Sequence, residues 1–135
     1  MPNLGDIIHY KEYEFEDGNK ANKLFVVLHN EPCLVLKTTS RPRRYNGAKQ
    51  GCNEDLKVFF APVSWQSCFN IDTYIQLPQI FEFSIHELLS GGALGSGNIE
   101  ILDSALSDDC LPQLKNCLKK FKDDISQNHW KLISW

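Results

Sequence analysis

Residues 23–49 decide the fold of this protein, and they read KLFVVLHNEPCLVLKTTSRPRRYNGAK. Two short apolar runs, residues 24–28 and 33–36, are rich in valine, leucine and phenylalanine. Turn-forming residues separate the runs, which is typical of two paired β-strands. Because the first run is apolar on both faces, we expect it in the centre of a sheet rather than at an edge.

The second run leads into a cationic segment, residues 37–49, which we call the basic loop. It holds no acidic residue, although the whole chain carries a net charge of −3, so the positive charge is local. Arginine suits phosphate, and a tyrosine can stack on an unpaired base. The loop could instead be a plain solvated surface. We predict nucleic-acid contacts from Lys37, Arg41, Arg43, Arg44, Tyr45 and Lys49.

The remaining chain predicts more strands around this hairpin. Apolar or alternating segments bounded by turn residues place them at residues 5–13, 57–63, 72–77, 79–83 and 98–102. The strand that begins with the run at residues 33–36 is the third along the chain. Its Leu34 and Leu36 share one face, which we expect to point inward. Lys37 and Thr39 share the other face, and we expect them to point together toward the loop side of the fold. Residues 1–135 therefore predict a single, mainly β domain, an antiparallel barrel of about five to seven strands.

Two helices are expected beside the strands. Ser84 and Glu87 form a capping box that starts a short helix over residues 84–90. A longer helix over residues 109–126 follows from an apolar stripe with spacings of three and four, and Asp108 or Asp109 is its expected N-cap. The tail after residue 128 is aromatic, so we expect it to pack on the core or on a partner.

Cysteine spacing and the length of the apolar runs indicate the cellular compartment and bear on disulfides and metal binding. The five cysteines, at positions 33, 52, 68, 110 and 117, contain no C-x-x-C pair, so we expect reduced thiols rather than a disulfide framework or a zinc site. No apolar run approaches the roughly 20 residues that a membrane helix needs. The first residues lack the basic flank and apolar run of a signal peptide. We therefore expect a cytoplasmic protein with no membrane contact, metal ion or cofactor.

Four segments together resemble one known family. They are GDII at residues 5–8, KLFVVL at 23–28, LKTTS at 36–40, and ALSD at 105–108 ahead of the amphipathic helix. Their order along the chain resembles the PemK/MazF family of toxin ribonucleases. The resemblance implies an SH3-like barrel with a C-terminal helix and a metal-independent endoribonuclease that cleaves single-stranded RNA. It also implies a homodimer, and a small protein antitoxin that covers the RNA groove.

The resemblance also points to catalytic residues. In the family, an arginine that opens the second strand acts with a threonine that ends the third; here these positions hold Lys23 and Thr39. Lysine lacks the planar fork of arginine, so its grip on a phosphate differs. Antiparallel neighbours joined by a short turn bring the two positions together. We predict Lys23 and Thr39 as catalytic residues, and the general base stays open between His9 and His29.

The sequence leaves three functions open. The first is the RNA-cleaving toxin of a toxin–antitoxin pair. The second is a non-catalytic SH3-like barrel that binds nucleic acid or an acidic protein partner through the basic loop. The third is a structural or phage-derived protein whose basic loop only contacts a partner.

Overall fold

The protein is described from a computed structural model, which places residues 3–14, 17–40, 45–65, 69, 71–84, 99–107 and 109–133. The strands are β1 (Asp6–Glu14), β2 (Lys20–His29), β3 (Cys33–Thr39), β4 (Gly51–Asn53), β5 (Val58–Ala61), β6 (Thr73–Phe83) and β7 (Ile99–Ala105). The helices are α2 (Cys110–Lys119) and α3 (Gln127–Ile133), with short 3-10 turns at Val63–Trp65 and Lys122–Asp124.

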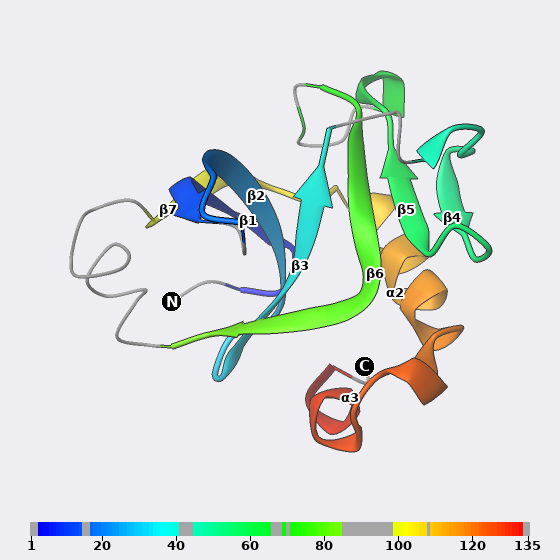
Figure 1. The fold of residues 1–135 in the computed structure, drawn as a ribbon. Coiled ribbons are helices and arrows are strands. Elements are labelled where there is room, and N and C mark those ends of the chain that lie inside the picture. The colour runs from blue at the N-terminus through cyan, green and yellow to red at the C-terminus, as the bar shows by residue number, and fades with distance from the viewer. Residues whose placement is uncertain are drawn as a thin grey trace.

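The described strands form one antiparallel sheet in the order β4-β5-β6-β3-β2-β1-β7 (Figure 1). The predicted class, mainly β with helical structure at the C-terminal end, is confirmed. Within the described part of the chain the sheet is open between its edge strands β4 and β7. The closed SH3-like barrel therefore stays a prediction.

The central hairpin lies where the sequence places it. β2 pairs with β1 on one side and with β3 on the other, and Phe25, Val26 and Val27 are fully buried. Both strands extend beyond the apolar runs, because β2 gains ladder partners in β1 as far as Lys20, and β3 gains partners in β6 as far as Thr39. Backbone pairing, rather than side-chain pattern, sets these ends.

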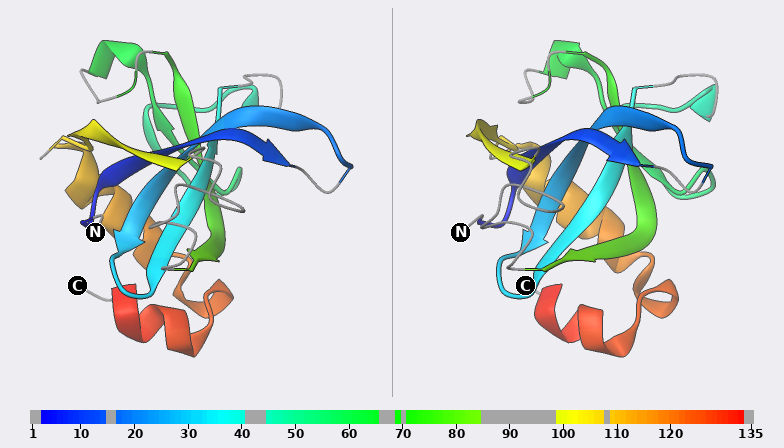
Figure 2. Two further views of the ribbon diagram at one scale, coloured as in Figure 1. Left: turned by 90° about the vertical axis from the view of Figure 1, so that its left-hand side faces the viewer. Right: turned by 60° about the vertical axis from the view of Figure 1, so that its left-hand side comes forward.

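Each face of the sheet buries its own apolar cluster. Leu34 and Leu36 face a core that includes Leu114 and Leu118 of α2, which lies across one face of the sheet (Figure 2). The inward orientation of the two leucines is therefore confirmed. The opposite face is also buried, because Cys33 belongs to a second cluster with rings that include Phe25 and Phe83. One strand supplies both clusters because its successive side chains point to opposite faces of the sheet, Leu34 and Leu36 to one and Cys33 and Val35 to the other.

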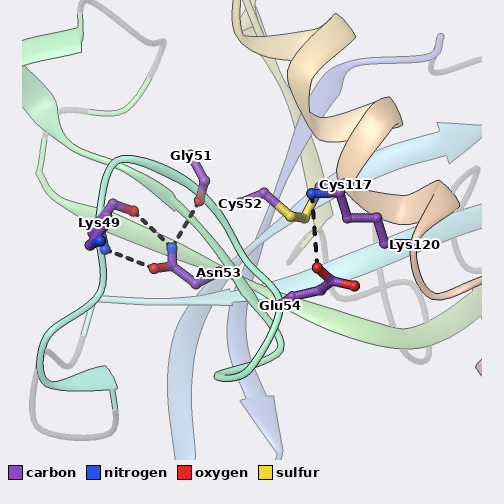
Figure 3. Close-up of a disulfide and its surroundings, with 7 residues drawn as sticks. All are labelled: Lys49, Gly51, Cys52, Asn53, Glu54, Cys117 and Lys120. Atoms are coloured by element: carbon purple, nitrogen blue, oxygen red, sulfur yellow. Dashed lines mark hydrogen bonds and ion pairs between the residues drawn. A yellow bond between two sulfur atoms is a disulfide. The ribbon is translucent and has the colours of Figure 1, made fainter.

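A disulfide corrects the expectation of reduced thiols throughout. Cys52 of β4 and Cys117 of α2 are joined, with their Cα atoms 5.5 Å apart (Figure 3). The two residues are 65 positions apart, and no spacing motif links them; only the packing of α2 on the β4 edge brings them together. Cys33 and Cys110 are buried thiols outside this disulfide, and Cys68 lies outside the described residues.

Two features of the sheet differ from the predicted strands. β4 lies between the basic loop and the strand predicted at residues 57–63, where the sequence predicts no strand; its three residues pair with β5. β6 continues through Pro78, where the sequence predicts a break. Between the pairs Leu36↔Ile80 and Thr38↔Ile75, β6 advances five positions while β3 advances two. A bulge of this kind accommodates a proline, which has no N–H to give to the ladder.

Helix α2 is shorter than the helix predicted over residues 109–126. α2 ends at Lys119, and the chain passes through a 3-10 turn to an extended Ile125 before α3 begins. The apolar stripe survives the break, because Phe121 and Ile125 remain buried. The start of α2 also differs, since Asp109 makes no side-chain cap.

At that start the Ser107 hydroxyl accepts the Cys110 N–H at 3.1 Å, in the role predicted for an aspartate. Asp108 lies outside the described residues, as does the predicted short helix after Ser84. The aromatic tail packs on the core as expected, through the buried Ile133 and the half-buried Trp130 of α3.

Candidate functional site

The structure brings Lys23 and Thr39 together where β2 begins and β3 ends. Phe25 pairs with Lys37, so continuing the antiparallel register leads to Lys23 and Thr39. Both residues line one pocket of about 150 Å³. The Lys23 ammonium donates a hydrogen bond to the carbonyl oxygen of Thr38 at 3.2 Å, which fixes the cation at the pocket wall. The predicted proximity is therefore confirmed.

Residues with hydroxyl groups line the same pocket as this cation. The pocket is lined by Thr38, Thr39, Ser40 and Thr73, together with Asn22, Leu24 and Ile71. The Thr38 hydroxyl donates to the Leu24 carbonyl at 2.9 Å, and the Thr73 hydroxyl donates to the Ile71 carbonyl at 2.9 Å. These two hydroxyls hold the pocket walls in shape. An ammonium with three N–H donors beside further hydroxyls suits an anion with several oxygen atoms.

A second, larger pocket of about 410 Å³ adjoins the first. Five lining residues are common to both pockets, namely Asn22, Lys23, Leu24, Ile71 and Thr73. The additional lining residues are Ile7, His9, Phe69 and Leu102. The larger pocket is thus mostly apolar, with Lys23 at its junction with the polar pocket. No local sequence pattern predicted this larger pocket, because its lining residues come from β1, β2, β7 and the segment before β6.

The two candidate histidines differ in position. His9 of β1 lines the larger pocket and pairs with Leu24 of β2 and Glu100 of β7. His29 lies at the other end of β2, where its Nδ1 is 2.9 Å from the carbonyl oxygen of Pro32 in the turn to β3. Of these two histidines, His9 is therefore the one that shares a pocket with Lys23.

Part of the predicted basic loop has a structural role. The Lys37 ammonium lies 5.7 Å from the centre of the Tyr13 ring and 5.4 Å from that of Phe81, a cation–π arrangement on the aromatic side of the sheet. It is absent from the lining of both pockets. Arg41, Arg43 and Arg44 lie outside the described residues.

Tyr45 belongs to a stack of three rings. Its ring lies 5.4 Å from Tyr74, which in turn lies 4.5 Å from Phe60, and its hydroxyl accepts a hydrogen bond from Gln76 at 2.9 Å. Because Tyr74 also pairs with Thr39 across the β3–β6 ladder, the stack stands beside the polar pocket. One face of Tyr45 is thus occupied by protein.

Lys49 is the remaining described cation of the basic loop. Its side chain is exposed, and the side-chain amide of Asn53 holds its backbone: the Lys49 N–H donates to Asn53 Oδ1 at 2.8 Å, and Asn53 Nδ2 donates to the Lys49 carbonyl at 2.7 Å (Figure 3). The Lys49 position is therefore anchored, while its charge stays at the surface.

Compared with models of known protein families and with curated proteins, the sequence matches none of them. The PemK/MazF resemblance therefore stays a prediction that rests on the four segments quoted above. Among the helices that the structure describes, none is long and apolar enough to cross a membrane.

Proposed function

We propose that this protein is a metal-independent endoribonuclease that cleaves single-stranded RNA, the toxin of a toxin–antitoxin pair with a PemK/MazF-like, SH3-like barrel. The observation that supports the proposal best is the shared pocket of Lys23 and Thr39. A cation and a hydroxyl stand there beside the start of the basic loop, where an RNA backbone can run. The chain acts as a homodimer, and a small protein antitoxin covers the groove. We keep the cytoplasm as its proposed location, although a disulfide such as Cys52–Cys117 is more common in oxidising compartments.

The chemistry assigned to this pocket needs no metal. The 2′-hydroxyl of a nucleotide loses its proton and attacks the adjoining phosphorus, and the 5′-oxygen leaves with a proton. The products are a 2′,3′-cyclic phosphate and a 5′-hydroxyl. Negative charge grows on the phosphate oxygens, where the Lys23 ammonium and the Thr39 hydroxyl stabilise it. His9 is the proposed proton-transfer group, because it lines the adjoining pocket.

The test is cleavage of single-stranded RNA by purified variants. Loss of a positioned group that stabilises developing charge typically slows a reaction by about 100- to 1000-fold, so Lys23→Ala should nearly abolish cutting. Lys23→Arg keeps the charge and is the matched control. Thr39→Val should lower the rate and Thr39→Ser should largely retain it, because only serine keeps the hydroxyl.

Expression in cells gives a second readout. Wild-type expression should arrest growth, and Lys23→Ala or Thr39→Ala should relieve the arrest. Lys23 is only half-buried, so an unchanged denaturation midpoint will separate lost chemistry from lost folding. If purified protein cuts no RNA and expression is harmless, the nuclease proposal fails. If cutting survives Lys23→Ala, the centre lies elsewhere, and His9 is the next residue to replace.

A non-catalytic binding module is the second candidate. The ring stack of Phe60, Tyr74 and Tyr45 beside Thr39 favours it, because aromatic rings bind unpaired bases without chemistry. Lys23 in place of the family's arginine also favours it. RNA retained intact on the protein, with affinity lowered by Tyr45→Ala, would support this candidate; cleavage products would exclude it.

A further inference from the structure

The segment at the end of the basic loop is held in shape by the side chain of Asn53. The Asn53 amide accepts the Lys49 N–H at 2.8 Å and donates to the carbonyl oxygens of Lys49 at 2.7 Å and Gly51 at 3.0 Å (Figure 3). Asn53 is only 7% exposed, so water competes little for these hydrogen bonds. Residues 49–53, which we call the clamped segment, therefore move as one unit with the exposed Lys49 side chain at its start.

A short ladder and a disulfide attach the clamped segment to the rest of the protein. β4 pairs with β5 through its three residues, and a strand pair of this length is marginal by itself. The Cys52–Cys117 disulfide joins the middle of β4 to α2 (Figure 3). It keeps the segment against α2 even when the ladder opens. The disulfide therefore decides how firmly the Lys49 side chain is positioned.

Thiol exchange can open this disulfide. Cys52 is half-buried and Cys117 is buried, so an attacking thiolate reaches the pair at Cys52. A bond forms between the reductant sulfur and Cys52, the bond to Cys117 breaks, and Cys117 leaves as a thiolate that takes up a proton. A second reductant thiol then releases Cys52. The protein thus gains two electrons and two protons, while two reductant thiols become one disulfide.

We propose that the Cys52–Cys117 disulfide is a thiol-sensitive switch that sets how tightly the protein binds RNA through Lys49. The inference rests on the proposed function for its ligand, RNA. In the oxidised protein the Lys49 ammonium is in place before a phosphate arrives, whereas in the reduced protein the clamped segment must be ordered on binding. Ordering one long side chain typically weakens binding by about two- to tenfold, so reduction should lower the affinity for RNA by about that factor.

The switch would respond to the redox state of the proposed compartment. Disulfides in the cytoplasm are usually transient or redox-sensing. A reducing cytoplasm then favours the weakly binding form, and an oxidant favours the tightly binding form.

Hydrogen exchange tests the switch without RNA. The protein is treated with oxidised glutathione or with a thiol reductant, and alkylation followed by mass spectrometry records the state of Cys52 and Cys117. Reduction should remove exchange protection from residues 49–53 and leave the β2–β3 hairpin protected, which shows that the protein is still folded. The double variant Cys52→Ala/Cys117→Ala should exchange like the reduced wild type and ignore the reductant. Cys110→Ala retains the disulfide and is the matched control.

RNA binding tests the consequence of the switch. The ligand is a single-stranded RNA with 2′-O-methyl riboses, which cannot be cut by attack of the 2′-oxygen, and affinity is measured in both redox states. Lys49→Ala should weaken binding by the oxidised protein and remove most of the response to reductant. Lys11→Ala is the matched control, because Lys11 is an exposed cation on the distant strand β1 and should leave that response unchanged.

The outcomes separate this inference from the proposed function. The switch is overturned if Cys52 and Cys117 do not pair under oxidised glutathione, if reduction leaves residues 49–53 protected, or if RNA affinity is equal in both redox states. Each of these results stands even where Lys23-dependent cleavage is found. An affinity that falls on reduction, and no longer does so in Lys49→Ala, would support the switch; in a protein that cuts no RNA it would do so while the nuclease is refuted.

Discussion

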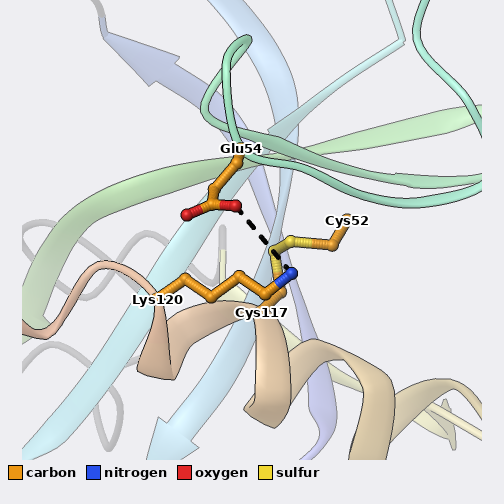
Figure 4. A network of polar contacts seen from close by, with 4 residues as sticks. All are labelled: Cys52, Glu54, Cys117 and Lys120. Carbon is orange, nitrogen blue, oxygen red and sulfur yellow. Dashed lines mark ion pairs between the residues drawn. A yellow bond between two sulfur atoms is a disulfide. The ribbon is translucent and has the colours of Figure 1, made fainter.

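Removing the disulfide between Cys52 and Cys117 should cost a large share of the stability of this fold. The bond closes a loop of 65 residues between the short edge strand β4 and helix α2. The Glu54–Lys120 ion pair beside it cannot replace it, because its atoms are 3.9 Å apart and both side chains are exposed (Figure 4). The double variant Cys52→Ala/Cys117→Ala removes the link and adds no polar group to the core.

The magnitude follows from the loop length. In the chain-entropy model, closing 65 residues removes about 14.5 cal/mol/K from the unfolded state, or about 4.3 kcal/mol at 25 °C. A chain of 135 residues has an unfolding entropy of about 0.28 kcal/mol/K near its midpoint. The midpoint temperature should therefore fall by about 15 °C.

Urea denaturation with and without a thiol reductant measures the effect. The reductant should lower the free energy of unfolding of the wild type and leave the double variant unchanged. Cys110→Ala, another buried cysteine of α2, is the control for a small cavity, and it should keep its response to reductant. A difference below about 1 kcal/mol between wild type and double variant would contradict the loop-entropy reasoning.

Other predictions concern charge, titration and packing. Replacing Arg41, Arg43 and Arg44 together with alanine should weaken RNA binding and reduce the slope of log affinity against log salt by about 2, since each single-strand phosphate contact contributes about 0.7; an unchanged slope rules the contacts out. Burial raises the pKa of the Cys33 thiol to about 11. Because the thiol ionises at a lower pH in the unfolded chain than in the folded one, ionisation of Cys33 should lower the free energy of unfolding as the pH rises from 9 to 11. A Cys33→Ala variant that loses as much stability as the wild type over this pH range would refute this prediction. Leu118→Ala, at a fully buried position of α2, should cost about 2 to 5 kcal/mol in denaturant melts, and a cost below about 1 kcal/mol would mean the helix packs loosely.

The sequence by itself determined the parts of this protein that depend on neighbours along the chain. Alternation and apolar runs predicted the central hairpin, and a short turn between two antiparallel strands necessarily brings Lys23 close to Thr39. The spacing of Leu114 and Leu118 predicted the buried face of α2. These inferences held because each rests on the fixed geometry of one strand pair or one helix.

Tertiary structure decided what depends on residues far apart in the chain. Cys52 meets Cys117 only because α2 packs against the β4 edge, and no spacing rule encodes that contact. The larger, mostly apolar pocket is lined by Ile71 and Leu102, which come from separate segments and lie beside Leu24 of β2 only in the folded chain. Lys37 belongs to the basic loop by sequence. In the folded chain its ammonium lies against the rings of Tyr13 and Phe81. Periodicity specifies which face of an element is apolar; which distant element covers that face is decided when the whole sheet twists and packs.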